Sequence, residues 1–125
     1  MEFLGGLKDK QVGDIFEFGR YPQSPEGKEK PIRWLVLRRD SDSLLVVSEY
    51  ILDAKRYTEN IFKVSWSECT LRAWLNGEFM EKAFDESERH LILLTELYNY
   101  PGPSTEDHIF VLREKDVAEF FDEVI

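Results

Sequence analysis

The amino-acid sequence predicts an α+β fold in which a small antiparallel sheet packs against two or three helices. Two observations lead to this fold class. The first third of the chain holds three apolar segments joined by short polar turns, and later parts of the chain hold apolar residues at helical spacing. A length of 125 residues is typical of one domain with one core, so we expect a single domain over residues 1–125.

Three strands are predicted in the first third. The segments GDIFEFGRYPQ (residues 13–23), IRWLVLRR (32–39) and SLLVVSEYIL (43–52) are rich in aromatic and β-branched residues. Ile32, Trp34 and Val36 share one face of the second segment, and the other face also carries leucines, so we expect this strand to be covered on both sides. The second and third segments are joined by only about four polar residues, DSDS (40–43), of which the last also begins the third segment. This spacing predicts an antiparallel meander.

A helical pattern follows in WSECTLRAWLNGEFMEKAF (residues 66–84), where Leu71, Trp74 and Leu75 form an apolar stripe that we expect to face the core. Residues 53–64 before it lack any clear period and are predicted to be an irregular surface segment. Ser65 and Glu68 have the spacing of a capping box, which predicts a helix start, and we expect a break or bend at Gly77. Asp85 and Glu88 repeat the capping relation and predict a second, short helix from about residue 86.

The last quarter of the chain predicts a loop, a strand and a helix. YNYPGPSTED (98–107) has the prolines and glycine of a loop, and HIFVL (108–112) has the composition of a fourth strand. In EKDVAEFFDEVI (114–125), an apolar stripe lies opposite a mainly acidic face. The stripe comprises Val117, Phe120, Phe121 and Val124, and the acidic face comprises Glu114, Asp116, Glu119, Asp122 and Glu123.

Composition and charge exclude several kinds of partner. The net charge of -9 disfavours nucleic acids and anionic membranes as partners. A local group of basic residues does occur near the second strand, and it is best explained as protection of a strand edge. This group comprises Lys28, Lys30, Arg33, Arg38 and Arg39. No segment has the features of a signal peptide or of a membrane span, and a single cysteine fits a reducing compartment, so we expect a cytoplasmic protein.

Catalytic and metal sites are disfavoured by the residues available. Cys69 is the only cysteine, and helical spacing places it away from the apolar stripe of its own helix, which includes Leu71, so we expect a half-exposed structural thiol. His90 and His108 match no zinc spacing, and no glycine-rich phosphate loop occurs. We therefore predict no metal, no cofactor and no catalytic residue.

Four residues are candidates for ligand binding: Tyr57, Trp66, Arg72 and Asn76. Arg72 and Asn76 are neighbours one turn apart, and their planar polar groups can bind carboxylates or carbonyls. The alternative is structural. Arg72 would then pair with Glu68, and Asn76 would help to end the helix before Gly77.

The sequence resembles a widespread bacterial family of uncharacterised domains. The resemblance extends over nearly the whole chain, and its most specific element is the pattern Trp66, Leu71, Arg72, Trp74, Leu75 and Asn76, followed by Phe79. It implies a relation to C-type-lectin-like folds but no established activity. The chain departs from the family pattern because it lacks the later Trp-Trp-Leu-Arg-Ser and Gly-Val-Arg-Pro-Ala stretches, so we expect a shortened form of that fold.

These observations favour a non-catalytic binding or interaction module for an unknown small molecule or protein. The alternative is a small hydrolase-like enzyme with a site around Arg72. A shortened fold would expose an apolar surface or a strand edge, which the last helix could cover by folding back as a lid or by forming half of a symmetric interface. Of these two, we expect the homodimer, because a lid alone would not cover an open sheet edge.

Overall fold

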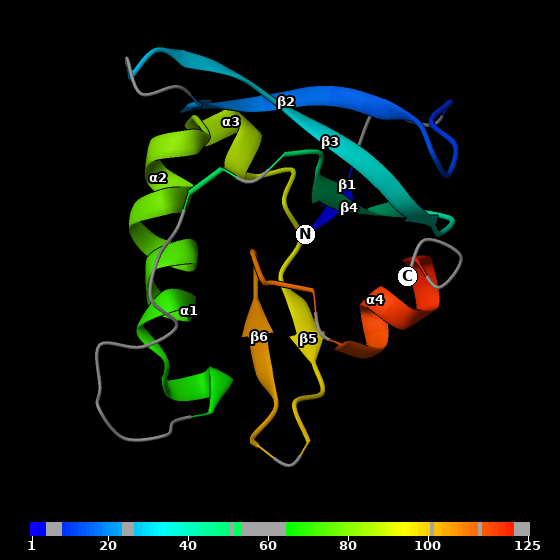
Figure 1. Ribbon diagram of the computed structural model, residues 1–125, viewed down its shortest axis with the longest axis vertical. Helices are drawn as coiled ribbons and strands as arrows, with labels where there is room; N and C mark the ends of the chain where they lie inside the picture. The colour runs from blue at the N-terminus through cyan, green and yellow to red at the C-terminus, as the bar shows by residue number, and fades with distance from the viewer. Residues whose placement is uncertain are drawn as a thin grey trace.

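The protein is described by a computed structural model that covers residues 1–4, 9–23, 27–50, 52–53, 65–100, 102–112 and 114–121. A four-stranded and a two-stranded antiparallel sheet occur in these residues together with short helices. The α+β fold class is therefore confirmed. Figure 1 shows β2 and β3 crossing one end of the molecule, the α1–α2 helix running down one side, and β5 and β6 at the opposite end.

The larger sheet has the strand order β1-β4-β3-β2. Its strands are β1 (Glu2–Leu4), β2 (Ile15–Pro22), β3 (Glu29–Arg39) and β4 (Ser43–Ser48). The predicted meander is confirmed, because β2 pairs with β3 and β3 pairs with β4, both antiparallel. Strand β1 was not predicted, since a three-residue strand is too short to show a periodic pattern.

One face of this sheet supplies the core. Ile32, Trp34 and Val36 are buried as predicted, whereas Arg33 is exposed and Leu35 only half-buried, so the second face is partly open. The ring of Phe84 lies at the centre of this core, where it stacks on Trp34 with ring centroids 6.3 Å apart.

A glycine permits the close approach of the sheet and the helix. Gly19 lies where β2 and β3 shift register and has a φ of +76°, a value that L side chains rarely adopt. A Cβ atom at this position would be 2.5 Å from Phe84 Cε1 and 2.9 Å from the carbonyl oxygen of Ala83. The glycine therefore allows β2 to lie directly against the end of α2.

The predicted helix over residues 66–84 forms, but its start and middle differ from the expectation. A 3-10 turn, η1 (Trp66–Glu68), precedes α1 (Thr70–Trp74), and Ser65 forms no side-chain cap. Cys69 caps α1 instead, because its sulfur accepts a hydrogen bond from the Arg72 amide, and its side chain is buried rather than half-exposed.

The helix does not break at Gly77. It continues through a π-helical turn, η2 (Leu75–Phe79), into α2 (Met80–Ala83). The second helix is confirmed as α3 (Glu86–Arg89), and its predicted capping box between Asp85 and Glu88 is present.

The smaller sheet corrects the prediction for the last quarter of the chain. Its strands are β5 (Thr95–Leu97) and β6 (Thr105–Asp107), whereas residues 108–112 are not a strand. The strand β6 therefore lies inside the segment predicted to be a loop. Gly102 and Pro103 lie in the connection between these two strands. Their loop-type composition led to the prediction of a loop that also covered the three strand residues that follow.

The final helix is confirmed as α4 (Glu114–Phe121). Val117 and Phe120 are half-buried, but Asp116 is buried at 7% exposure although the sequence placed it on the acidic, solvated face. This helix therefore buries part of its polar side, which a simple two-face pattern does not predict. Phe121 and Val124 also belong to the predicted stripe, but the part of the chain that the structure describes does not include their side chains.

Candidate functional site

Three of the four predicted binding residues meet at strand β6. Trp66, Arg72 and Asn76 all donate hydrogen bonds to residues 106–109, which follow them by more than thirty positions in the sequence. The fourth, Tyr57, lies outside the described residues. The structure therefore brings Trp66, Arg72 and Asn76 together, and the hydrogen bonds described above for them are made with the chain itself.

Asp107 is the centre of this polar cluster. Its carboxylate is buried at 1% exposure and accepts from Trp66 Nε1 at 2.9 Å, from Arg72 Nε at 2.6 Å and from Thr105 Oγ1 at 2.7 Å. A buried carboxylate needs a charged partner and several donors, and this environment supplies both. We call Trp66, Arg72, Thr105 and Asp107 the Asp107 cluster.

Arg72 uses its remaining donors on backbone carbonyls. Nη1 donates to Ser67 at 3.2 Å and Nη2 donates to Glu106 at 3.4 Å. The ion pair that the structure describes for this arginine is with Asp107, not with Glu68. The structural alternative thus correctly assigned Arg72 to an ion pair but named the wrong partner, because the true one is distant in sequence.

Asn76 binds the backbone of the segment that follows β6. Its Oδ1 accepts from the amides of His108 and Ile109 at 2.8 and 2.9 Å, and its Nδ2 donates to the Ile109 carbonyl at 2.8 Å. The same Nδ2 lies 3.1 Å from the Arg72 carbonyl within the helix. Because the helix continues past Gly77, Asn76 fixes the chain after β6 rather than ending the helix.

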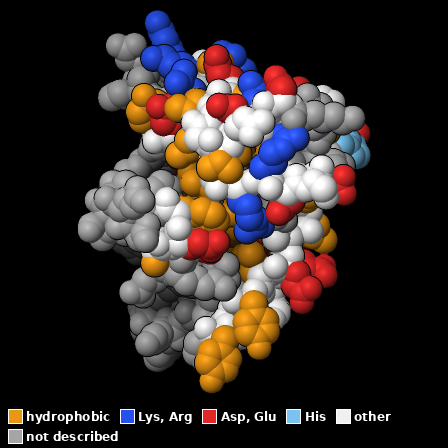
Figure 2. All heavy atoms as spheres, turned by 90° about the vertical axis from the view of Figure 1, so that its right-hand side faces the viewer, with side chains coloured by type: hydrophobic (Ala, Val, Ile, Leu, Met, Phe, Trp, Pro, Cys, Tyr) orange, Lys and Arg blue, Asp and Glu red, His pale blue; other side chains and the backbone are white. Residues whose placement is uncertain are grey.

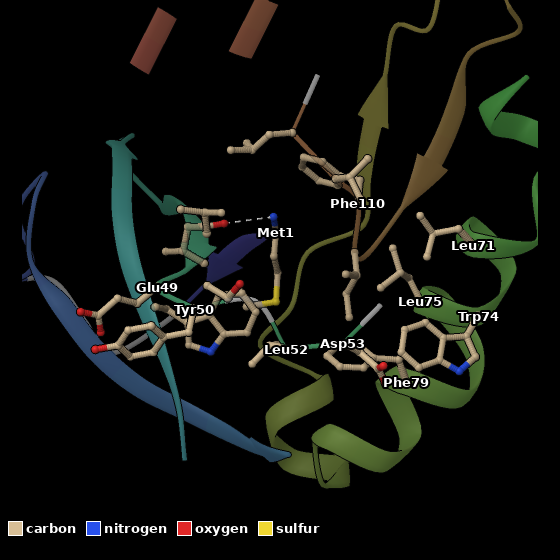
Figure 3. A pocket seen from close by; sticks show the side chains of 17 residues that line it. Met1, Glu49, Tyr50, Leu52, Asp53, Leu71, Trp74, Leu75, Phe79 and Phe110 are labelled. Atoms are coloured by element: carbon tan, nitrogen blue, oxygen red, sulfur yellow. Dashed lines mark hydrogen bonds between the residues drawn. The ribbon is translucent and has the colours of Figure 1, made fainter. Parts of the chain in front are cut away.

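A pocket of about 540 Å³ lies beside this region, between the larger sheet, the α1–η2 helix and residues 109–112. Figure 3 shows Leu71, Leu75 and Trp74 on one side of the pocket, Glu49 and Tyr50 on the other, and Met1 and Phe110 between them. The pocket is lined by Met1, Trp34, Val46, Val47, Ser48, Glu49, Tyr50, Leu52, Asp53, Leu71, Trp74, Leu75, Phe79, Ile109, Phe110, Val111 and Leu112. This lining is mainly aliphatic and aromatic.

Two carboxylates at the pocket already have partners in the chain. Glu49 pairs with Arg33 across 2.5 Å, and its hydrogen bond and charge raise the pKa of the arginine. Asp53 accepts a hydrogen bond from the Tyr21 hydroxyl at 2.5 Å. Burial of the phenol, followed by this hydrogen bond and the negative charges of Asp53 and Glu78, raises the pKa of Tyr21 to about 12. Both contacts hold the chain after β4 against the sheet.

The polar residues and the pocket are connected through the segment after β6. Asn76 and the Asp107 cluster fix residues 107–109 on the helix, and residues 109–112 form one wall of the pocket. Trp66, Arg72 and Asn76 therefore help to position a wall of the pocket, but they are not among its described lining residues.

Sequence reasoning missed the pocket-lining residues because it assigned them to the core. Leu71, Trp74 and Leu75 form the apolar stripe of the helix, and all three are half-buried rather than enclosed. A stripe facing a core and one facing a pocket have the same period, so no signal in the sequence distinguishes them.

The described ranges contain neither a metal-binding group of side chains nor a membrane-spanning helix. Within them, no three histidine, cysteine, aspartate or glutamate side chains are grouped closely enough to hold a metal ion. In the same part of the chain, no helix has the length and apolar character needed to cross a membrane.

Comparison with known proteins identifies a family without a known role. The family model described as Domain of unknown function (DUF6273) matches residues 41–124, which is more than half of the chain. Neither a curated protein nor a solved structure gives a significant match.

Proposed function

Because the chain belongs to the DUF6273 family of domains of unknown function, its role must be argued from its own site, and we propose that it is a non-catalytic binding module. The observation that carries this proposal is the mainly apolar pocket of about 540 Å³ between sheet and helix. Pockets of a few hundred cubic ångströms with apolar walls and few polar groups are typical of small-molecule sites.

The lining indicates the chemistry of the ligand. Trp34, Trp74 and Phe79 offer aromatic surface, and the aliphatic side chains of the helix and of β4 complete an apolar cavity. The ligand is therefore a small, largely apolar molecule, or an apolar side chain of a partner protein. Burial of apolar surface would supply most of the binding free energy, at roughly 25 cal/mol per Å².

The contacts of Arg72 favour this role over the small hydrolase with a site around Arg72. Nε, Nη1 and Nη2 of Arg72 each donate to an acceptor within the chain, in an arrangement that supports the hairpin. A substrate carboxylate would have to replace Asp107, which is itself buried and bound to two other donors. The C-type-lectin-like relation stays a hypothesis, since no solved structure matches the chain.

The experiment uses N-phenylnaphthylamine, an uncharged fluorescent probe whose emission rises in apolar surroundings. We expect saturable binding to the protein and about tenfold weaker binding to the Leu71→Trp variant, in which the larger ring fills part of the pocket. The matched control is Leu94→Trp, the same substitution at a leucine that is 54% exposed and not part of the lining.

Circular dichroism first establishes that both variants fold. Equal affinity of the Leu71→Trp and Leu94→Trp variants would place the probe elsewhere and contradict the proposal. Absence of any saturable binding to the unchanged protein would contradict it as well.

A further inference from the structure

The β5–β6 hairpin presents an outer face of unusual composition. Leu94, Glu96 and Tyr98 alternate with half-buried or buried neighbours along β5 and its ends, and Leu94 and Tyr98 are 54% and 72% exposed. Residues two apart in an extended chain point to the same side. Tyr100, in the turn that follows, is 82% exposed. Figure 2 shows hydrophobic and acidic side chains projecting close together at the end of the molecule that this hairpin occupies.

Two acidic residues lie directly opposite each other on this face. Glu96 and Glu106 are Cα partners in the β5–β6 register, and both are exposed. Like charges at such positions destabilise a sheet. Within the described part of the chain, no ion pair compensates either carboxylate. A cation placed between them would remove this repulsion.

The face is held in place by hydrogen bonds on the other side of the hairpin. Asn99, between the two tyrosines, donates to the Pro103 carbonyl at 3.0 Å and to Thr105 Oγ1 at 2.9 Å. Thr105 in turn donates to Asp107, which is bound to Arg72 of the helix. The aromatic side chains therefore project from a fixed backbone, so a partner would bind them with little loss of backbone entropy.

We propose that this outer face, formed by Leu94, Glu96, Tyr98, Tyr100 and Glu106, docks an arginine-containing basic segment of another protein. Carboxylates bind the planar guanidinium through paired hydrogen bonds, and tyrosine rings attract it by cation–π interaction. The net charge of -9 attracts a basic partner over a longer range. This interaction surface is separate from the pocket and does not depend on the proposed ligand.

The probe is a fluorescein-labelled peptide of alternating arginine and glycine, measured by fluorescence anisotropy at low ionic strength. A second peptide carries citrulline, an uncharged isostere, at each arginine. We expect the arginine peptide to bind, the citrulline peptide to bind at least about tenfold more weakly, and added salt to weaken binding.

Two double variants test whether the outer face is responsible. Glu96→Gln/Glu106→Gln and Tyr98→Ala/Tyr100→Ala should each weaken binding of the arginine peptide about tenfold. The matched control Glu81→Gln/Glu119→Gln changes the net charge equally at exposed glutamates outside the hairpin and should bind almost as the unchanged protein does. The Leu71→Trp variant, whose pocket is filled, should also bind normally.

The outcomes separate the alternatives. Equal losses in the hairpin and control glutamate variants would show attraction by overall charge alone and overturn the proposal. Unchanged binding by the tyrosine variant, or equal binding of both peptides, would overturn it too. Loss of peptide binding in Leu71→Trp would assign the peptide to the pocket instead.

Discussion

At the scale of single residues, the polar side chains of the helix connect distant parts of the chain. Arg72 and Asn76 are surface-type residues by sequence, yet both bind the segment around Asp107. The sequence singled out these two residues because their planar polar groups can bind carboxylates and carbonyls, and a role in ligand binding stays a prediction. It could not identify their partners, since contacts across thirty positions leave no local pattern.

The Asp107 cluster should contribute strongly to stability. Asp107→Asn keeps the size of the side chain but removes the charge that Arg72 faces, and it converts one acceptor into a donor. Because Arg72 is 29% exposed, we expect a loss of about 2–3 kcal/mol, less than for a fully buried ion pair. Urea unfolding measures the loss, and the exposed neighbour variant Glu106→Gln should change stability by less than about 0.5 kcal/mol.

Gly19 should tolerate no side chain. Gly19→Ala combines an unfavourable positive φ with a collision against Phe84 and Ala83, so we expect a loss on the order of 3 kcal/mol. Gly27→Ala is the control, because its φ is +74° but no atom lies within 4 Å of the added Cβ. We expect a loss of about 1 kcal/mol there. Equal losses in thermal unfolding would show that the backbone, and not the packing on α2, limits Gly19.

At the scale of elements, long and regular segments could be predicted and short ones could not. Strands β2, β3 and β4 were recognised mainly from their aromatic and β-branched residues, and helix α4 was recognised because its apolar residues repeat one period. Strands β1, β5 and β6 have three residues each, and the π-helical turn has five, so tertiary contacts decide their conformation. The pocket was not predicted for a related reason, since its lining residues come from five separate segments of the chain.

The contact between β2 and the chain after β4 should depend on pH. The pKa of Tyr21 is raised from 10.0 to about 12 in the folded protein, so folding favours the neutral phenol. Its contribution to stability is complete below about pH 10 and is lost as the pH rises from 10 toward 12. Urea unfolding at several pH values should show a steeper fall in this window for the unchanged protein than for Tyr21→Phe. Parallel curves would contradict the assignment.

At the scale of the whole molecule, the homodimer expected from the amphipathic final helix stays a prediction. Val117 and Phe120 of α4 are only half-buried, and therefore have apolar surface available to a second copy. We expect a dimer that buries more than about 1,000 Å² in total. Sedimentation over a wide concentration range tests it, and a monomer at the highest concentration would contradict it.

The π-helical turn between α1 and α2 has a consequence for how the chain can vary. Each α-helical residue turns the helix surface by about 100°, and a π turn holds about one residue more than an α turn. Because of that extra residue, Asn76 faces the smaller sheet while Phe79 and Met80 face the larger one. An added Cβ at Gly77 meets nothing within 4 Å, so Gly77→Ala should raise the melting temperature slightly. Deletion of Gly77 should instead lower it strongly, because α1 would rotate relative to α2 and lose one of its two partners. Relatives of this chain should therefore differ in the identity of residue 77 far more readily than in the length of the helix.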